Sequence, residues 1–470
     1  MGLRPNGFQD RLVMTASISL RIFYDFRRDF GLFSTVDSAI MRNALAYSAL
    51  KLYQSRGKKS SDSVACGKSR RDGGIPASLS AVYFRTAARK GGRSPQKVLT
   101  AARVAAYITS MKITVYAISK NEEKFAARWV KSMSEADEIV VLDTGSTDDT
   151  VGILTAAGVR VKQAVIKPWR FDVARNESLK LVSEDTDVCV CTDLDEVFEP
   201  GWRAALEKSW APDIVQGRYR YIWSHVEGGK PGVEFYAEKV HALHGFRWVN
   251  PVHEVLACSL PARKVATLEG VTLHHYPDDS KSRAAYLPLL ELAVKEDPAN
   301  DRNAHYLGRE YYFRGRYDEA IRELRRHLAL KTAVWTDERA ASMRYIARCC
   351  RALNRRDEAE VWYLRAVAEA PGVREAAVEL GRMLYEEGNY YGAVFFLEKA
   401  LAVKSRSASY INDPDCWSAL PYDLLSLSYY FIGRYPEAVE NSDEAVARSD
   451  EPRLKTNREF FVAARDKNGK

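Results

Sequence analysis

Short apolar runs alternate with amphipathic stretches between residues 112 and 200. Runs rich in β-branched residues predict strands at Ile113–Ile118, Glu138–Leu142, Val159–Val165 and Asp187–Thr192, of which the first two are expected to be buried. Helical spacing of apolar residues in the intervals predicts helices at Phe125–Met133, Thr150–Ala157 and Asp172–Val182. Strands separated by helices in this way predict a mostly parallel sheet with right-handed crossovers, in which ligands bind beyond the carboxyl ends of the strands.

The last third of the chain repeats a helical pattern. The aligned alanines Ala320, Ala359, Ala393 and Ala438 are 39, 34 and 45 residues apart. Five positions before each alanine stands a residue that tolerates a left-handed turn, namely Gly315, Asn354, Gly388 and Gly433. Twelve positions before each alanine stands a small residue, namely Gly308, Ala347, Gly381 and Ser426. Helix pairs with a period near 34 residues are typical of tetratricopeptide repeats, so we predict about four such repeats within 300–450.

Charge divides the chain near residue 110. Residues 1–110 hold 19 Lys/Arg, 6 Asp and no Glu, whereas the remaining 360 residues hold 51 Lys/Arg and 56 Asp/Glu. The net charge of +8 therefore comes from the first segment, which we interpret as a basic N-terminal extension with a helix-like stretch at Ile18–Tyr53. Because the rest of the chain is mildly acidic, a nucleic-acid partner is not favoured. A second hypothesis takes Met111 as the true start, since the first buried strand follows it directly.

Composition adds two expectations about the compartment. The longest run without a charged residue is the twelve residues 73–84, whereas a membrane-spanning helix needs about 20 apolar residues, so no membrane span is expected. The seven cysteines are odd in number and lack the spacing of a metal finger. This pattern favours free thiols in a reducing compartment, and we predict a cytoplasmic protein.

Polar residues follow three of the predicted strands. Ser119 to Glu123 follow the first, and Asp143 to Thr150 follow the second. Asp143 either shapes a turn before a capped helix or accepts hydrogen bonds from a nucleoside hydroxyl or base. After the fourth strand, three carboxylates crowd together at Asp193, Asp195 and Glu196. A divalent cation would relieve their repulsion, and oxygen ligands favour Mg²⁺ or Mn²⁺, which can bridge diphosphate oxygens. The alternative is a solvated acidic turn.

Histidines are concentrated further along the chain. Six of the eight lie between residues 225 and 275, namely His225, His241, His244, His253, His274 and His275. A single histidine is usually structural, but a cluster that follows a carboxylate triplet can supply another metal ligand. Lys239 and Arg247 could contact phosphate.

Four motifs in order now carry a family resemblance. They are AISKNEE, EIVVLDTGSTDDT, RFDVARNESL and CTDLDEVFEPGW, all within 113–203. This segment resembles family-2 glycosyltransferases with the GT-A fold. The later motifs WVNPVHEVL, VTLHHYP and SRAAYLPLLELAVKEDP resemble a bacterial branch that continues into helical repeats, of which peptide S-glycosyltransferases are an example. The resemblance covers about 112–450. It implies an α/β GT-A domain (Rossmann-like, with a mostly parallel sheet) at 111–285, followed by an all-α tetratricopeptide-repeat solenoid.

The resemblance also implies site residues. Nucleotide-sugar binding is implied for Ser119, Asn121, Glu122, Asp143, Gly145, Ser146, Asp172, Arg175, Asn176 and Asp193. Asp143 would lie at the uridine. Asp193 and Asp195 would form the metal motif for Mn²⁺ or Mg²⁺, and His274 or His275 would complete the metal shell. Asp195 and Glu254 are the implied catalytic residues, with Glu254 as the base or as an acceptor contact.

The implied reaction is the inverting, metal-dependent transfer of a sugar, from a UDP-sugar donor, to an acceptor that the sequence does not identify. A peptide, another glycan, lipopolysaccharide core and a modified nucleotide all remain open as acceptors. The repeats would bind a protein partner, mediate self-association or only cap the catalytic domain. Three alternatives are a non-catalytic interaction protein with a decayed transferase domain, a haloacid-dehalogenase-like phosphatase, and a transferase that its basic extension brings to nucleic acid.

Overall fold

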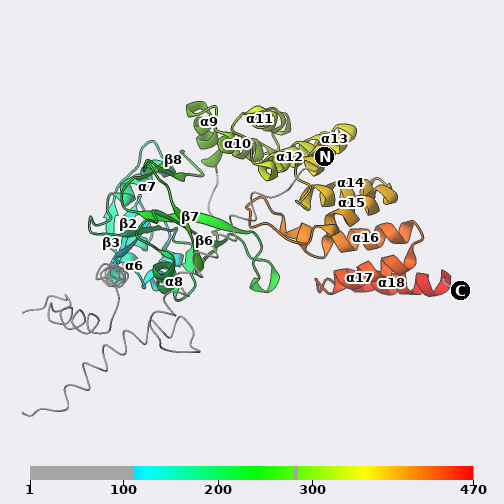
Figure 1. Cartoon of the computed structure of the whole chain (residues 1–470), viewed down its shortest axis with the longest axis horizontal. Helices are drawn as coiled ribbons and strands as arrows, with labels where there is room; N and C mark the ends of the chain where they lie inside the picture. Colours follow the sequence, from blue (N-terminus) through cyan, green and yellow to red (C-terminus); the bar gives the residue numbers. More distant parts are fainter. Residues whose placement is uncertain (1–110, 279–283, 469–470) are drawn as a thin grey trace, which may run out of the picture. The chain divides into compact units, whose positions relative to one another are not determined.

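The computed structural model describes residues 111–278 and 284–468 (Figure 1). The predicted basic extension and its helix-like stretch lie outside the described residues. A region of strands and helices runs from β1 to β10, and a purely helical region runs from α9 to α18.

The first region contains ten strands and four helices in the described residues. The strands are β1 (Ile113–Ser119), β2 (Glu138–Asp143), β3 (Arg160–Gln163), β4 (Val188–Cys191), β5 (Glu196–Phe198), β6 (Gln216–Ile222), β7 (Glu234–Ala242), β8 (Phe246–Val249), β9 (Val255–Cys258) and β10 (Val265–His275). The helices are α5 (Glu123–Met133), α6 (Thr150–Ala156), α7 (Phe171–Leu179) and α8 (Trp202–Ser209). Every strand and helix that the apolar pattern predicts is therefore present, with ends shifted by at most two or three residues.

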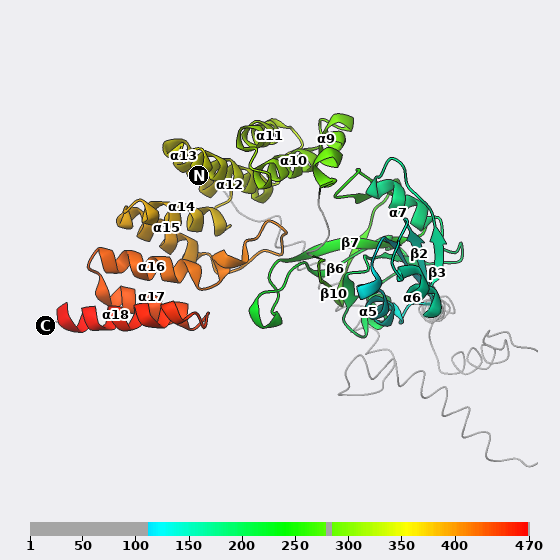
Figure 2. The same cartoon turned by 180° about the vertical axis from the view of Figure 1, so that it is seen from behind.

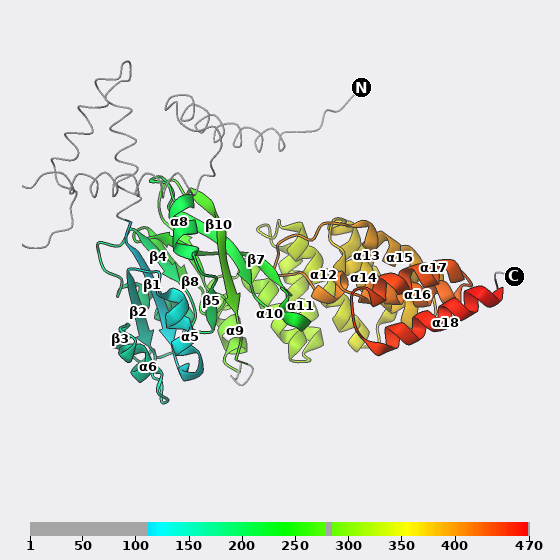
Figure 3. The ribbon, with the colours of Figure 1, turned by 90° about the horizontal axis from the view of Figure 1, so that it is seen from below.

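Eight strands form one sheet in the order β3-β2-β1-β4-β7-β6-β10-β5, and β8 pairs with β9 in a separate hairpin. The neighbours β3, β2, β1 and β4 are mutually parallel, as predicted (Figure 3). The two antiparallel strands β7 and β5 make the sheet mixed. The sheet is nevertheless mostly parallel, which confirms the predicted α/β class.

Both faces of β1, β2 and β4 are covered, which explains why their sequences are continuous apolar runs, whereas the edge strand β3 is mostly exposed. Val115 and Val190 face the cluster that includes Trp129 of α5 and Trp202 of α8. Tyr116 faces the opposite side, where Leu179 of α7 packs. Because successive strand residues point to opposite faces, each of these strands contributes to both cores.

The strand register aligns the polar segments at one edge of the sheet. Ser119 at the end of β1 pairs with Asp143 at the end of β2, and Tyr116 pairs with Cys191 at the end of β4. On the other side of the sheet, β5 pairs with β10 so that Glu196 lies opposite His275. These pairings bring the carboxylate triplet and the late histidines to the same part of the sheet.

The helical region contains ten helices among the described residues, α9 (Tyr286–Glu296), α10 (Asp301–Phe313), α11 (Tyr317–Ala329), α12 (Thr336–Ala352), α13 (Arg356–Glu369), α14 (Glu375–Glu386), α15 (Tyr390–Ala402), α16 (Leu420–Phe431), α17 (Tyr435–Val446) and α18 (Pro452–Asn468). Four helix pairs, α10/α11, α12/α13, α14/α15 and α16/α17, follow one another in chain order (Figure 2). This is the predicted tetratricopeptide arrangement.

The repeat positions behave as the pattern predicts. The four aligned alanines are completely buried. A Cβ atom on Gly308 would lie 2.5 Å from Leu324, and one on Gly381 would lie 2.7 Å from Leu397, so these glycines allow the two helices of a pair to approach closely. The turn residues Gly315, Asn354, Gly388 and Gly433 all have positive φ angles, between 57° and 78°. Left-handed turns therefore separate the two helices of every pair.

Candidate active site

Arg175 connects the two halves of the candidate site. Helix α7 places this residue beneath the strand ends, where it is 4% exposed. Its Nη2 donates to Asp193 Oδ1 at 2.7 Å, and its Nε donates to Glu254 Oε1 at 2.7 Å. A guanidinium matches two carboxylates because its donors form a planar fork. Arg175 therefore fixes the predicted metal motif and the predicted base in one network.

Lys239 of β7 lies on the other side of Asp193. Its Nζ is 3.1 Å from Asp193 Oδ2 and 2.9 Å from Glu196 Oε1. Glu196 is completely buried, and it also accepts hydrogen bonds from the Tyr221 hydroxyl and from the Asp193 backbone N–H. Two cations thus balance Asp193 and Glu196 before any substrate is present.

Two residues of the carboxylate triplet, Asp193 and Glu196, have pKa values shifted in opposite directions. Burial raises the pKa of the Asp193 carboxyl, but the charges of Arg175 and Lys239 outweigh burial and hold this pKa well below its usual range. Burial raises the pKa of Glu196, and the charges of Asp193 and Asp195 add to that rise against the effect of Lys239. Asp193 is therefore ionised, and both of its oxygens have partners.

Asp195 and His275 face each other without a full set of partners. His275 Nε2 lies 3.4 Å from Asp195 Oδ2, and Asp195 Oδ1 is buried with no hydrogen-bond partner among the described residues. His275 Nδ1 lies 2.9 Å from the Trp223 carbonyl oxygen. Because a carbonyl only accepts, Nδ1 carries a proton, so Nε2 is the nitrogen that can lose its proton and bind a cation beside Asp195. Burial lowers the pKa of His275, but Asp195 and the Trp223 carbonyl outweigh burial and raise it. This arrangement is typical of a metal-ligating histidine, and the residues present fit a divalent cation.

His274 points away from Asp195. Its Nδ1 is 3.0 Å from His225 Nε2, and its Nε2 is 3.0 Å from Glu199 Oε1. Adjacent strand residues project to opposite faces, so β10 can direct only one of its two final histidines to the carboxylates. Of the two predicted alternatives, the structure brings His275 rather than His274 next to Asp195.

Two more histidines of the predicted cluster, His241 and His253, make hydrogen bonds or ring contacts within the fold. His241 is completely buried between the Tyr116 hydroxyl and the Ala242 carbonyl, and burial lowers its pKa to about 4. His253 stacks on Tyr306 with a centroid distance of 4.0 Å.

The loop after β2 is held by Asp143. The Asp143 carboxylate accepts from the backbone N–H groups of Gly145 and Ser146 and from the hydroxyls of Ser119 and Ser146, and it is completely buried. Asn121, which has a φ of 55°, accepts from the Thr147 backbone N–H and so ties the loop after β1 to the loop after β2. In this structure Asp143 shapes the turn, and its contact with uridine stays a prediction.

Other residues of the third motif also hold the framework. Arg170 donates to both oxygens of Asp172 at 2.9–3.0 Å. The Asn176 carboxamide donates to the Trp248 carbonyl and accepts from the Trp248 N–H, each at 2.9 Å, which attaches β8 to α7. Nucleotide contacts for Asp172 and Asn176 stay predictions.

Two site features were missed from the sequence. The Trp223 carbonyl, which fixes the His275 ring, is a backbone group and leaves no sequence signal. The Trp223 ring is 46% exposed and stacks near His275, with a centroid distance of 6.1 Å. The available sequence signal for the Trp223 ring was its place in the aromatic-rich segment RYRYIWSH, which ends at His225.

Comparison with known proteins agrees with the motifs. The family Glycosyl transferase family 2 matches residues 114–247. An uncharacterized glycosyltransferase of Rickettsia conorii is 46% identical over 59 residues, which cover 12% of this chain and 20% of that protein. An uncharacterized glycosyltransferase of Rickettsia bellii is 30% identical over 116 residues, which cover 24% of this chain and 37% of that protein. The chain thus spans well under half the length of these curated relatives.

Among solved structures, the chain resembles glucosyl-3-phosphoglycerate synthase from Mycobacterium tuberculosis, which was crystallised with Mn²⁺, UDP and glucosyl-3-phosphoglycerate. The two are 27% identical over 25% of this chain and 47% of that chain, with a TM-score of 0.22. Separately, none of the helices in the described ranges combines the length and the apolar character that crossing a membrane requires. The four ordered motifs, the sheet and the family match agree, and residues 114–247 form a glycosyltransferase family 2 domain.

Proposed function

We propose that this chain transfers a sugar, with inversion, from a UDP-sugar to a protein or glycan acceptor in a metal-dependent reaction. One observation carries the proposal: His275 Nε2 lies 3.4 Å from Asp195 Oδ2, and Asp195 Oδ1 is buried with no hydrogen-bond partner in the described part of the chain. His275 Nδ1 is held by the Trp223 carbonyl, which leaves Nε2 for a cation. Asp195 directly precedes β5, which pairs with the carboxyl end of β10 at His275, and the carboxyl ends of strands are the expected place for a ligand in such a sheet.

Asp195 and His275 would hold the cation, whose charge would stabilise the diphosphate leaving group. A nitrogen ligand favours Mn²⁺ over Mg²⁺, which prefers oxygen ligands. The Asp193 oxygens already accept from Arg175 and Lys239. We therefore assign Asp193 to the donor-binding surface beside the cation. A metal contact by Asp193, as the motif predicts, would require one of these two cations to move.

The remaining steps are bond cleavage in the donor and deprotonation of the acceptor. The donor's bond between the anomeric carbon and the diphosphate oxygen breaks, and the electron pair leaves with the diphosphate. The acceptor oxygen attacks from the opposite face and loses its proton to a carboxylate, so an α-linked donor gives a β-linked product. Glu254 is our candidate for this base, because Arg175 holds it in the same network as Asp193.

The acceptor class rests on the repeats. Four tetratricopeptide-like pairs stack in chain order, and such solenoids commonly bind peptides or other subunits. A protein acceptor, or a protein partner that presents a glycan, fits this combination. The position of the Asp motif argues against the phosphatase alternative, since the motif follows β4 rather than the first strand.

Calorimetry on the full-length chain tests the proposal. UDP should bind in the presence of Mn²⁺, and the affinity should fall at least tenfold with EDTA or in Asp195→Ala. His274→Gln is the matched control, because this neighbouring histidine points away from Asp195. UDP binding that is equal with Mn²⁺ and with EDTA would reject the metal site. No binding of any nucleoside diphosphate would favour the non-catalytic interaction protein.

A further inference from the structure

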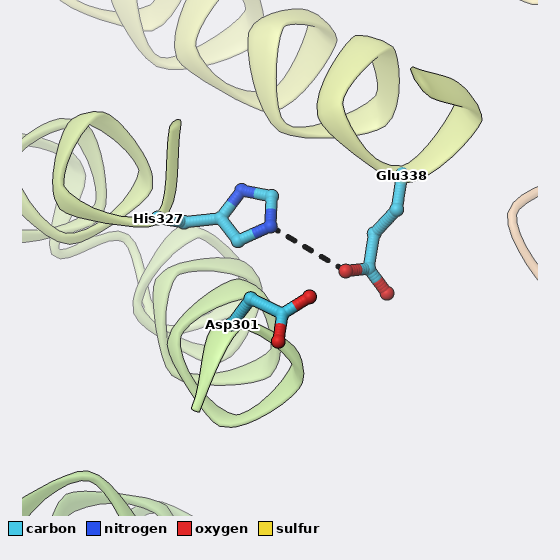
Figure 4. Close-up of side chains that lie close together, drawn as sticks. All are labelled: Asp301, His327 and Glu338. Carbon is cyan, nitrogen blue, oxygen red and sulfur yellow. Dashed lines mark ion pairs between the residues drawn. The ribbon is translucent and has the colours of Figure 1, made fainter. Parts of the chain in front are cut away.

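A second cluster of potential metal ligands lies among the first repeat helices, outside the candidate active site. Asp301 begins α10, His327 lies near the end of α11, and Glu338 lies in the first turn of α12. One ligand atom from each lies within 4.8 Å of the others, and the side chains converge as Figure 4 shows. His327 is completely buried and Glu338 is 4% exposed.

His327 Nε2 points into this cluster without a hydrogen-bond partner among the described residues. It lies 3.4 Å from Glu338 Oε1, whereas a charge-assisted N–H···O bond is usually about 2.7–2.9 Å long. Ligands at about 2.0–2.2 Å from a tetrahedral Zn²⁺ lie roughly 3.4 Å apart along each edge. The separation of the two atoms therefore fits two ligands of one ion better than a direct hydrogen bond.

The other polar atoms of these two side chains, His327 Nδ1 and Glu338 Oε2, already have hydrogen-bond partners. His327 Nδ1 is 2.9 Å from Ser342 Oγ, and that hydroxyl is 2.7 Å from His305 Nδ1. Ser342 has a single proton, which goes to one of the two histidines. When it goes to His305, Ser342 accepts from His327 Nδ1–H, and Nε2 of the neutral His327 ring has the bare lone pair that a metal ligand requires. Glu338 Oε2 accepts from the Tyr410 hydroxyl, so Oε1 is the oxygen that faces the cluster. Outer contacts of this kind orient metal ligands.

Asp301 supplies the remaining charge. Neither a hydrogen bond nor an ion pair involves its side chain within the part of the chain that the structure describes. The adjacent Arg302 does not neutralise it, because the Arg302 guanidinium lies over the rings of Tyr306 and Tyr410 at 4.9 and 5.5 Å. Two carboxylates and one imidazole nitrogen thus lie within 4.8 Å of one another.

We propose that Asp301, His327 and Glu338 bind one divalent transition-metal ion, with Zn²⁺ as the best-fitting candidate and water as its fourth ligand. The three ligands come from three consecutive helices, so the ion would clip the first repeat to the second. An ion bound only by the folded chain stabilises it by mass action. The site is separate from the candidate active site and does not depend on the proposed reaction.

The test uses full-length chain carrying Asp195→Ala, which removes the candidate active-site ligand, after treatment with EDTA and dialysis. Zn²⁺ titration by calorimetry should detect a site whose affinity falls at least tenfold in Asp301→Asn and in Glu338→Gln. Co²⁺ should give the visible absorption of a four-coordinate ion, and both variants should lose it. Zn²⁺ should also raise the melting temperature of the parent by several degrees and leave that of the variants unchanged.

The matched control is Asp337→Asn, which alters the neighbouring carboxylate of α12 and should retain the site. Asp301→Asn is informative even if Glu338→Gln fails to fold, because Asp301 is only half-buried and its side chain has no hydrogen bond or ion pair to lose with any residue that the structure describes. Zn²⁺ affinity that is unchanged in Asp301→Asn, or no zinc-dependent rise in melting temperature in the parent, would overturn the proposal. His327 and Glu338 would then form a simple buried ion pair.

Discussion

At the scale of single residues, the site depends on which way neighbouring side chains point. His274 and His275 are consecutive on β10, yet one contacts His225 and Glu199 and the other faces Asp195. The same sheet geometry leaves Arg175 as the single described side chain that bridges Asp193 and Glu254. For each arrangement, a variant and a matched control should differ in a measurable way.

His275→Ala should lower metal-dependent UDP release by about 100-fold or more, because it removes a metal ligand from a charge-stabilising site. His274→Ala should stay within about threefold of the parent. Steady-state assays at saturating Mn²⁺ compare the two. A larger loss in His274→Ala than in His275→Ala would show that the wrong histidine has been assigned.

Arg175→Gln should lower the free energy of unfolding by about 3–5 kcal/mol, because it leaves the half-buried Glu254 without its cation and takes one of two cations from Asp193. Urea unfolding followed by circular dichroism measures this change. Arg247→Gln is the control, since Arg247 is exposed on β8. A loss below about 1 kcal/mol in Arg175→Gln would mean that the network does not hold the site together.

At the scale of elements, the repeat region depends on close helix crossings and on a buried ion network. Gly381 allows α14 to approach α15, and Glu379 of the same helix accepts from Arg344 and Arg348 of α12. The first contact lies within one repeat, and the second joins two repeats.

Gly381→Ala should destabilise the chain by about 1–2 kcal/mol, because the added Cβ would lie 2.7 Å from Leu397 and this overlap outweighs the gain in helix propensity. Gly372→Ala is the matched control, because a Cβ there has open space. Melting temperatures of the two variants give the comparison. Equal melting temperatures would contradict the close crossing.

Acid should weaken the contact between repeats. Burial raises the pKa of Glu379, but the charges of Arg344 and Arg348 outweigh burial and lower it to about 2. The stabilisation from ionised Glu379 is therefore complete above about pH 4.5 and is lost as the pH falls toward 2, about 3 kcal/mol in total. Glu379→Gln should remove this part of the acid dependence. An identical pH profile of unfolding for parent and variant would refute the assignment.

At the scale of the whole molecule, the sequence predicts the fold well and the site in part. Apolar runs and repeat spacing predict β1, β2, β4 and the four helix pairs, because burial on both faces and close crossings restrict residue type strongly. The motifs also predict which segments meet at the strand ends. They do not predict that Arg175 and Lys239 occupy both oxygens of Asp193, nor that His275 is the histidine that faces Asp195, because these depend on register between distant strands.

The cluster of Asp301, His327 and Glu338 lay outside the sequence predictions for a similar reason. Its residues are 26 and 11 positions apart on three helices, and no short motif marks such spacing. Helix packing alone brings them together. The molecule thus combines a family 2 glycosyltransferase domain with a repeat region that carries its own candidate ion site.

Release of UDP from UDP-sugars by the purified full-length chain, measured with Mn²⁺ or with EDTA, tests the proposed metal-dependent transfer most directly. We expect release that requires Mn²⁺ and is lost in Asp195→Ala, with Asp337→Asn as the unaffected control. Release that persists in EDTA and in Asp195→Ala would contradict the assignment of Asp195 and His275 as the metal site.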